Sequence, residues 1–430
     1  MSALELRRAQ KEILHKASRR SAEAYFQRAS QQRRWLPVSN RYRRTCVERY
    51  AADTRAAAVN DSQLAQYVGA SAPAHAIDGW SCLGRAMDSA LRRDTYSAVH
   101  FGYYAELRAT MSLLAGEGIG IFNLCHPVID AAGATHRFPR TGGLGTHKVV
   151  WPIFRYWSTL KRASDLIDEI VSPALIPLSE WLSASGAAVP MRAVAQRWLS
   201  SWGVDLAAFD DDHDNRNLAS YRPSEFRSPP HLDIHEVAQF VEELWRLFEP
   251  STARRFPTIE RLLLRRAWRR GGAIPASASI EQLGVAAPEA AEWAAFLKDP
   301  SDSMPLRLAE EQSGIEDPRC HLRIISRAAL MLFVATSAAR RLLTQAAYTA
   351  ETLSFWWQRQ GEDRGLWNAA SRPDNPLDLW ADISNALDTS GLWRSNNSPG
   401  SSLRDWRQTQ MAALDGLGSF ELVGIWGLLP

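Results

Sequence analysis

The sequence has few cysteines and no long apolar run. Its four cysteines, Cys46, Cys82, Cys125 and Cys320, lie far apart and form no C-x-x-C pair. This spacing supports neither a zinc ribbon nor a dense disulfide framework, and it indicates reduced thiols in a reducing compartment. The longest strongly apolar run, residues 328–335, is too short to span a bilayer. The first twenty residues also lack the apolar stretch of a secretory signal. We therefore expect a cytoplasmic protein with no membrane contact.

The sequence also has no internal repeat and no long low-complexity tract. Its 430 residues exceed what one hydrophobic core usually serves, which predicts two or three packed units. Hydrophobic residues make up 46% and charged residues 23% of the chain, as in an ordinary folded protein. Seventeen tryptophans, spread from Trp35 to Trp426, predict a large buried interior in which each indole N–H needs an acceptor.

Positive charge is concentrated in two segments, although the whole chain carries a net charge of only +3. The first 50 residues contain thirteen Lys or Arg residues against four acidic ones, a net charge of +9. A second basic stretch, residues 254–270, includes Arg265 and Arg266. Basic segments attract the phosphates of nucleic acids, but they also occur as solvated helix faces. Both interpretations remain open for each segment.

The hydrophobic periodicity predicts an all-α fold, made of multi-helix bundle subdomains with one small inserted β-hairpin. The hairpin is expected after the glycine cluster GEGIGIFN, with its turn near Gly133. The segments expected to be helical are 3–34, 62–67, 82–91, 95–115, 146–157, 161–170, 174–184, 190–201, 233–248, 257–270, 286–298, 303–312, 318–359, 376–387 and 403–414. The Gly/Ala/Pro-rich segment 69–79 and the segment 387–404 are expected to be loops. We expect a basic N-terminal helical region over residues 1–90, a central helical domain with the hairpin over 91–250, and a C-terminal helical domain over 251–430.

The most specific motif is HDNRNLASYRP, residues 213–223, between an acidic loop and the helix predicted from Asp233. Here the chain resembles HEPN-type helical proteins, many of which are RNA-cutting toxins or defence effectors. The resemblance covers about residues 95–250. In that family an Arg-Asn pair, a few residues and then a His lie near the start of the last helix of a bundle. Arg216 and Asn217 match the pair, whereas Tyr221 occupies the position of the His.

The resemblance implies a role for each residue of this motif. Arg216 would neutralise charge developing on a phosphate, and Asn217 would hold the loop by hydrogen bonds. His213 or Tyr221 would carry the proton or donate to the substrate. Because an unperturbed Tyr exchanges protons poorly near neutral pH, either His213 substitutes for the family's His or the unit binds RNA without cutting it. The structural alternative is that Arg216 and Asn217 cap helices and pair with the acidic residues at 210–214.

A second polar group lies on the helix predicted over residues 95–115. His100, Tyr104 and Arg108 recur at four-residue spacing and so share one stripe of this helix, while Glu106 lies on another side. Polar side chains need partners when they are buried. They would therefore support a site around the Arg-Asn pair, or form an interior hydrogen-bond network between helices.

A third group surrounds the glycine-rich segment RTGGLGTHK, which begins at Arg140 and ends with His147 and Lys148. Glycines let backbone N–H groups approach an anion, and a following helix presents its positive end, with Thr146 as the expected cap. The order of residues is not that of a Walker A loop. The segment is therefore an anion- or nucleic-acid-binding candidate, or a flexible connector. No common metal-ligand spacing such as H-E-x-x-H is present, so we expect no metal and no cofactor.

The chain ends in an apolar segment, FELVGIWGLLP at residues 420–430. Such a segment is expected to dock on the protein's own surface or to bind a protein partner or a second copy of the chain. The leading hypothesis is a HEPN-like component, ribonuclease or RNA-binding, of a bacterial toxin or antiviral defence system, with RNA favoured over DNA as its ligand. The alternatives are a non-catalytic helical scaffold subunit and a nucleic-acid-binding protein that acts through its N-terminal helix. Whether the protein is an enzyme stays open at this point.

Overall fold

The computed structural model describes residues 5–30, 33–123, 125–139, 145–184, 190–203, 232–252, 255–271, 276–311 and 317–430. Over these ranges the chain is mainly helical and contains one two-stranded antiparallel sheet, so the predicted all-α fold with a small inserted hairpin is confirmed. The first helices are α1 (Arg8–Lys16), α2 (Arg20–Ala29), α3 (Cys46–Arg55), α4 (Asp61–Leu91), α5 (Thr95–Gly116), α6 (Thr146–Ser158), α7 (Lys161–Ile170), the 3₁₀ turn η1 (Pro173–Leu175), α8 (Leu178–Ser183) and α9 (Met191–Gly203). The later ones are α11 (Ile234–Leu247), α12 (Pro257–Gly271), α13 (Ser277–Glu281), α14 (Ala287–Lys298), α15 (Met304–Leu308), α16 (Cys320–Gln345), α17 (Ser354–Asp363), the 3₁₀ turn η3 (Pro376–Leu379), α18 (Trp380–Asn396), α19 (Leu403–Gly418) and α20 (Glu421–Leu428).

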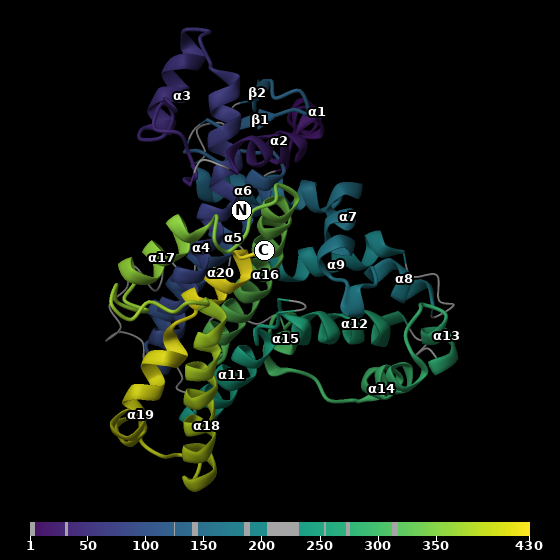
Figure 1. Ribbon diagram of the computed structural model, residues 1–430, viewed down its shortest axis with the longest axis vertical. Helices are drawn as coiled ribbons and strands as arrows, with labels where there is room; N and C mark the ends of the chain where they lie inside the picture. Colours follow the sequence, from purple (N-terminus) through teal and green to yellow (C-terminus); the bar gives the residue numbers. More distant parts are fainter. Residues whose placement is uncertain are drawn as a thin grey trace.

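Three long helices, α4, α5 and α16, pack against one another at the centre of the molecule (Figure 1). Most of their buried apolar side chains belong to one hydrophobic cluster that extends from Leu6 to Leu429. The domain boundary predicted after residue 90 falls in the last turn of α4, which packs against α5, and the one predicted after residue 250 falls between α11 and α12, which contact each other. The helices on the two sides of each predicted boundary share this cluster.

Helix α4 differs from the prediction of two short helices joined by a loop over residues 69–79. It is one continuous helix of 31 residues, with Pro73 inside it and the Asn60 side chain as its N-cap. The glycines of this segment serve close packing, because a Cβ at Gly79 would lie 2.5 Å from Cδ2 of Leu332 on α16. The small residues thus mark the places where neighbouring helices approach, and the prediction of a loop was wrong.

Two further boundaries differ from the prediction. The helix expected over residues 318–359 is divided into α16 and α17, and Ala347 between them has a left-handed backbone with φ of 58°. Helix α18 continues to Asn396, where a loop was predicted over 387–404. One side of its final turns packs against α11, where the Ser390 hydroxyl donates to Oε1 of Glu242 at 3.0 Å. This tertiary contact stabilises a stretch whose composition alone is typical of a loop.

The predicted hairpin is confirmed. Strand β1 (Pro127–Ile129) pairs antiparallel with β2 (Thr135–Arg137). The turn contains Gly133 with φ of 85°, a conformation that favours glycine. Oδ1 of Asp130 accepts hydrogen bonds from the backbone N–H groups of Ala132 and Ala134, both at 2.9 Å. The hairpin contacts α1 and lies with the N-terminal helices at one end of the molecule (Figure 1).

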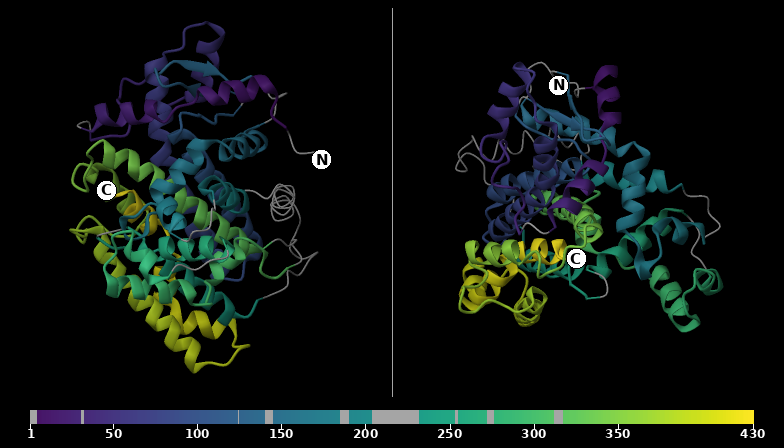
Figure 2. Two further views of the ribbon diagram at one scale, coloured as in Figure 1. Left: turned by 90° about the vertical axis from the view of Figure 1, so that its right-hand side faces the viewer. Right: turned by 45° about the horizontal axis from the view of Figure 1, so that its top comes forward.

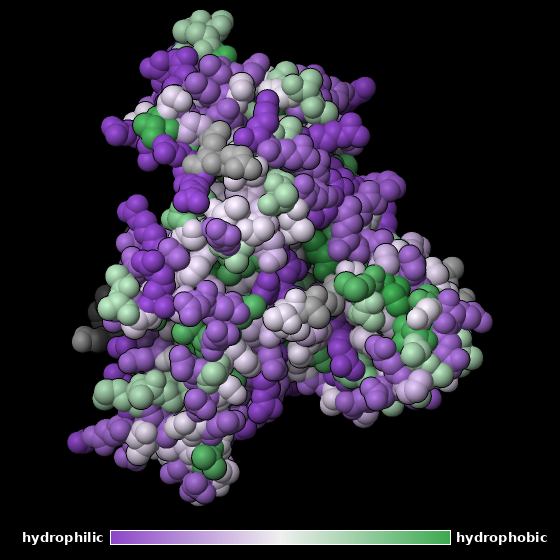
Figure 3. All heavy atoms as spheres, viewed as in Figure 1, coloured by the Kyte–Doolittle hydropathy of each residue, from purple (hydrophilic) through white to green (hydrophobic). Residues whose placement is uncertain are grey.

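A separate lobe carries α13 and α14 and projects away from the central helices (Figure 2). The face shown in Figure 3 is largely hydrophilic, and hydrophobic residues gather on it mainly over this lobe. Among the described residues, the large apolar side chains with the greatest exposure are Val38, Leu175, Leu392 and Met411. They are far apart in the sequence, and isolated exposed apolar residues are normal for folded proteins.

Two described segments, Cys320–Gln345 and Leu403–Leu428, are long and apolar enough to cross a membrane by length and composition. The apolar window of the first is 94% buried inside the protein, as expected for the central helix of a soluble protein. The second segment includes α20, whose apolar side chains pack on α4 and α16. Both findings are compatible with a soluble protein.

The apolar C-terminal segment docks into the chain's own core. Trp426 is fully buried and its Nε1 donates to the backbone oxygen of Pro376 at 2.7 Å. Leu422, Val423 and Leu428 are also buried. These side chains are therefore covered by the protein itself, and they do not form the exposed surface through which a partner or a second copy was expected to bind.

Candidate functional site

The HEPN-like motif itself lies outside the described residues. This applies to all four of its candidate catalytic residues, His213, Arg216, Asn217 and Tyr221, and also to Arg140 of the glycine-rich segment. Their predicted roles stay predictions. The site is built here from the other candidate residues.

The structure brings two of the predicted polar groups together. His100 and Tyr104 on α5 lie beside His147 in the first turn of α6, together with Tyr103 and Trp151. We call these five residues the α5–α6 cluster. Sequence reasoning missed Tyr103 and Trp151. The available signals were the position of Tyr103 next to Tyr104 and the four-residue spacing between His147 and Trp151, which places them on one side of α6.

Tyr103 and His147 make a direct polar contact in the cluster. The phenolic oxygen of Tyr103 lies 3.1 Å from Nδ1 of His147, and the two rings stack with centroids 5.8 Å apart. The Tyr104 ring meets the same imidazole edge-on, with centroids 5.8 Å apart, and contacts the His100 ring at 5.0 Å. These contacts fix the orientation of the imidazole, which a proton-transferring histidine requires.

The cluster has a buried wall and an accessible rim. Tyr103 and Trp151 are each 1% exposed, whereas His100, Tyr104 and His147 are half-buried. Lys148, the next residue along α6, is exposed. The imidazole is therefore held from one side by buried aromatic rings, and the residue that follows it on α6 is exposed.

The start of α6 adds positive potential to this rim. The N-cap is Gly145, one residue before the predicted Thr146, and the first turn contains no acidic residue. The N-terminus of a helix presents unpaired N–H groups and the positive end of its dipole, which favours anions. His147 and Lys148 both lie in this first turn. An imidazole, an ammonium group and a helix N-terminus together suit a phosphate group.

Two predicted members of the polar network point elsewhere. The Glu106 carboxylate pairs with Nε of Arg327 on α16 at 3.0 Å, and both side chains are buried. Nη1 of Arg108 lies 3.0 Å from Nδ1 of His75 on α4 and 3.9 Å from Asp78. Burial and then the Arg108 charge lower the pKa of His75, so its neutral ring can accept from the guanidinium. Glu106 therefore forms an interior contact between helices, one of the two alternatives that the sequence left open, whereas Arg108, with a side chain 37% exposed, joins α5 to α4 nearer the surface.

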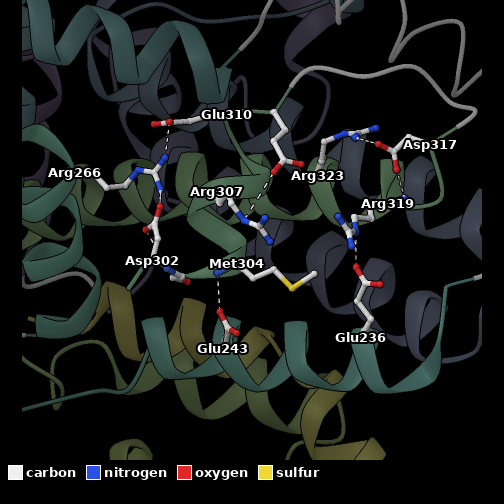
Figure 4. A network of polar contacts seen from close by, with 12 residues as sticks. Glu236, Glu243, Arg266, Asp302, Met304, Arg307, Glu310, Asp317, Arg319 and Arg323 are labelled. Atoms are coloured by element: carbon white, nitrogen blue, oxygen red, sulfur yellow. Dashed lines mark hydrogen bonds and ion pairs between the residues drawn. The ribbon is translucent and has the colours of Figure 1, made fainter. Parts of the chain in front are cut away.

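Arg265 and Arg266 on α12 lie in the interior, contrary to their predicted role in nucleic-acid binding. Figure 4 shows Arg266 between two carboxylates, Asp302 at 2.6 Å and Glu310 at 2.5 Å. Arg265 pairs with Asp299 at 3.1 Å, and its side chain is 4% exposed. Because both guanidinium groups are buried and paired with acids, Arg265 and Arg266 stabilise the fold and their charge is not presented to phosphates.

The N-terminal basic segment is different, because its charges face solvent. The exposed basic side chains of its described part are Arg7, Arg8, Lys11, Lys16, Arg20, Arg28, Arg33, Arg34, Arg43, Arg44 and Arg49. Helix α1 also contacts α6, where His15 Nε2 lies 2.5 Å from the Tyr156 hydroxyl and the Lys11 ammonium lies 5.6 Å from the centre of the Tyr156 ring. Nine residues of helix, about 14 Å at 1.5 Å per residue, separate Tyr156 from His147. Helix α6 thus connects the basic helix α1 to the α5–α6 cluster.

Comparison of the chain with known protein families, with curated proteins and with solved structures found no match. The function is therefore argued from the residues and their geometry. Within the described ranges, no group of three or more His, Cys, Asp or Glu side chains is arranged to hold a metal ion. The chemistry of the cluster is consequently discussed for its organic side chains alone.

Proposed function

We propose that this protein is an RNA-directed component of a bacterial toxin or antiviral defence system, and that the α5–α6 cluster contacts the RNA backbone. The observation that carries the proposal is the Tyr103–His147 contact of 3.1 Å in the first turn of α6. It orients an imidazole beside the exposed Lys148 and the positive end of the helix. The exposed basic residues of α1, joined to the same helix, supply further phosphate contacts.

The cluster and the adjacent Lys148 would provide two of the groups that RNA cleavage by internal transesterification requires. His147 would take the proton of a ribose 2′-hydroxyl while the 2′-oxygen forms a bond to phosphorus. The bond from phosphorus to the 5′-oxygen then breaks, and that oxygen takes a proton from a second acid. Lys148 would stabilise the additional negative charge on the phosphate. The motif implied by the resemblance would supply the remaining groups, with Arg216 acting on the phosphate and His213 or Tyr221 acting as the second acid.

The test compares RNA integrity in cells that express the wild type, His147→Gln, Arg216→Ala or the control Arg359→Gln. Arg359 is exposed on α17 and pairs only with Asp363 in the next turn among the contacts described. RNA fragmentation in the wild type and the control, lost in both other variants, would support cleavage at this site. Fragmentation that persists in His147→Gln would remove the cluster from the proposal.

A second measurement distinguishes RNA binding without cleavage from RNA cleavage. The affinity of the purified proteins for a labelled single-stranded RNA is measured by fluorescence anisotropy at two salt concentrations. A wild type that leaves RNA intact but binds it more tightly than His147→Gln does would support the RNA-binding form of the proposal. Intact RNA together with equal, weak binding by all four proteins would contradict an RNA-directed role and favour the scaffold alternative.

A further inference from the structure

A polar cavity of about 360 Å³ lies apart from the α5–α6 cluster, between α7, α12 and α16. Three arginines line it, Arg255 before α12 and Arg340 and Arg341 near the end of α16. Its volume is near the lower end of the range of about 300–1,000 Å³ that is typical of small-molecule sites. The arginines indicate that the cavity favours negative charge.

Arg255 is the least satisfied of these groups. Its side chain is 8% exposed, and Nη2 donates to the backbone oxygens of Leu429 at 3.1 Å and Pro430 at 3.3 Å. Its Nε and Nη1 atoms are buried and have no hydrogen-bond partner. Burial also lowers the pKa of this guanidinium. Buried guanidinium N–H groups without acceptors are costly, and a bound anion would offset that cost.

The cavity also contains acidic side chains. Glu169 accepts from Arg341 at 2.5 Å and from Arg19 at 3.2 Å, so it is shared between two arginines, and Arg341 also lies 3.7 Å from Glu23. Glu260 accepts from the backbone N–H of Ser172 at 3.1 Å. The feature of the lining that points to an anion is therefore the pair of buried N–H groups of Arg255 that have no acceptor.

We propose that this cavity binds a small oxyanion, a phosphate or carboxylate group carried by a compact polar molecule. The lining includes the hydroxyls of Thr252 and Ser337, which can donate to such an anion. The described lining residues include no aromatic side chain on which a nucleobase could stack. The ligand class is consequently a small phosphate ester or carboxylate, and this inference does not depend on the proposed RNA-directed role.

The experiment is isothermal titration calorimetry of the full chain with inorganic phosphate, glycerol 3-phosphate or citrate, against sodium chloride at equal ionic strength. The wild type is expected to bind one equivalent of at least one of these probes. Arg340→Gln should weaken that binding at least about tenfold, because the variant removes one charge-assisted contact. The matched control, Arg359→Gln, removes an equal charge outside the cavity and should bind like the wild type.

Each outcome bears on the proposal. Binding of phosphate or glycerol 3-phosphate identifies a phosphate site, and binding of citrate alone identifies a carboxylate site. Arg255→Gln, checked for folding by circular dichroism, should also lose affinity for the same probe. The absence of saturable binding to all three probes would overturn the proposal, as would equal affinity in Arg340→Gln and Arg359→Gln.

Discussion

The Glu106 carboxylate on α5 accepts a hydrogen bond of 3.0 Å from Nε of Arg327 on α16, and the two side chains are 6% and 8% exposed. This pair joins two of the three central helices inside the core. Removing one member of a buried ion pair costs about 3–5 kcal/mol, because the other charge loses its counterion. We expect Glu106→Leu to lower the free energy of unfolding by this amount, measured by urea denaturation with tryptophan fluorescence.

The double variant Glu106→Leu/Arg327→Leu provides the control for this prediction. It removes both charges and leaves apolar side chains at the two positions, so it should recover most of the stability lost in Glu106→Leu. A double variant as unstable as the sum of the two single ones would show that the pair contributes no coupling between α5 and α16.

The buried histidine His126 predicts a pH-dependent stability. It is 3% exposed, and neither ring nitrogen has a hydrogen-bond partner. Burial lowers its pKa to about 4 in the folded protein, whereas an unfolded chain has a His pKa of about 6.5. Between these values the unfolded chain binds more protons, so the stability contributed by neutral His126 is present above about pH 6.5 and is lost as the pH falls toward 4.

His126→Leu should remove this contribution to acid sensitivity. Relative to the wild type, we expect the variant to gain about 2 kcal/mol more stability at pH 5 than at pH 7.5, because protonation of His126 no longer favours the unfolded chain. Urea denaturation at the two pH values measures the difference. The same change in stability at both pH values would contradict burial of a neutral imidazole at this position.

The sequence predicted helices and the hairpin better than it predicted where helices end. Alternating apolar residues and Gly133 were sufficient for the hairpin, because its turn is a local structure. Residues 69–79 were misread as a loop because the Gly, Ala and Pro content of α4 serves contacts with helices distant in sequence. Arg265 and Arg266 were misread as a surface patch, since their acidic partners follow more than 30 residues later.

Part of the candidate site could also be predicted from local sequence patterns. The four-residue spacing of His100 and Tyr104 placed them on one stripe of α5, and the glycine-rich segment indicated a helix that starts near His147. That these two groups meet depends on how α5 packs against α6, which no local pattern encodes. The role of Tyr103 became visible only through its 3.1 Å contact with His147.

Two glycine substitutions, one on α20 and one on α18, should have opposite effects on stability. A Cβ at Gly424 would lie 2.7 Å from Cδ1 of Trp80 and 2.7 Å from Cδ1 of Ile77, both on α4. Gly424→Ala should therefore lower the free energy of unfolding by about 1–3 kcal/mol through overpacking. Gly391, inside α18, has no neighbouring atom within 4 Å of an added Cβ. Gly391→Ala should stabilise the protein by up to about 1 kcal/mol, because Ala favours the helix.

Thermal unfolding of the two variants beside the wild type measures this pair of effects. The two substitutions add the same methyl group, so a raised midpoint in both would mean that intrinsic helix propensity outweighs packing at Gly424, and a lowered midpoint in both would contradict the open environment of Gly391. A lowered midpoint for Gly424→Ala alone would agree with an α20 that is held tightly against Trp80.

Removing the charge of the exposed Lys148 and removing that of the buried Arg266 should have different effects on RNA binding and stability. Lys148 is exposed at the start of α6, so under the proposed function Lys148→Gln should weaken RNA binding and reduce the slope of log affinity against log salt by about 1. Arg266 is held by Asp302 and Glu310. Arg266→Gln should leave those carboxylates without their cation and lower stability, while the RNA affinity of the folded protein stays at the wild-type value.

Fluorescence anisotropy with a labelled single-stranded RNA, from 50 to 200 mM salt, measures both variants under conditions where each is folded. Because both substitutions remove one positive charge, the change in net charge is matched, and a purely global electrostatic effect would weaken both equally. A loss of affinity confined to Lys148→Gln would locate phosphate contact at the rim of the α5–α6 cluster. A loss confined to Arg266→Gln would instead require the α12 arginines to leave their carboxylates and bind RNA, which the short distances at Asp302 and Glu310 oppose.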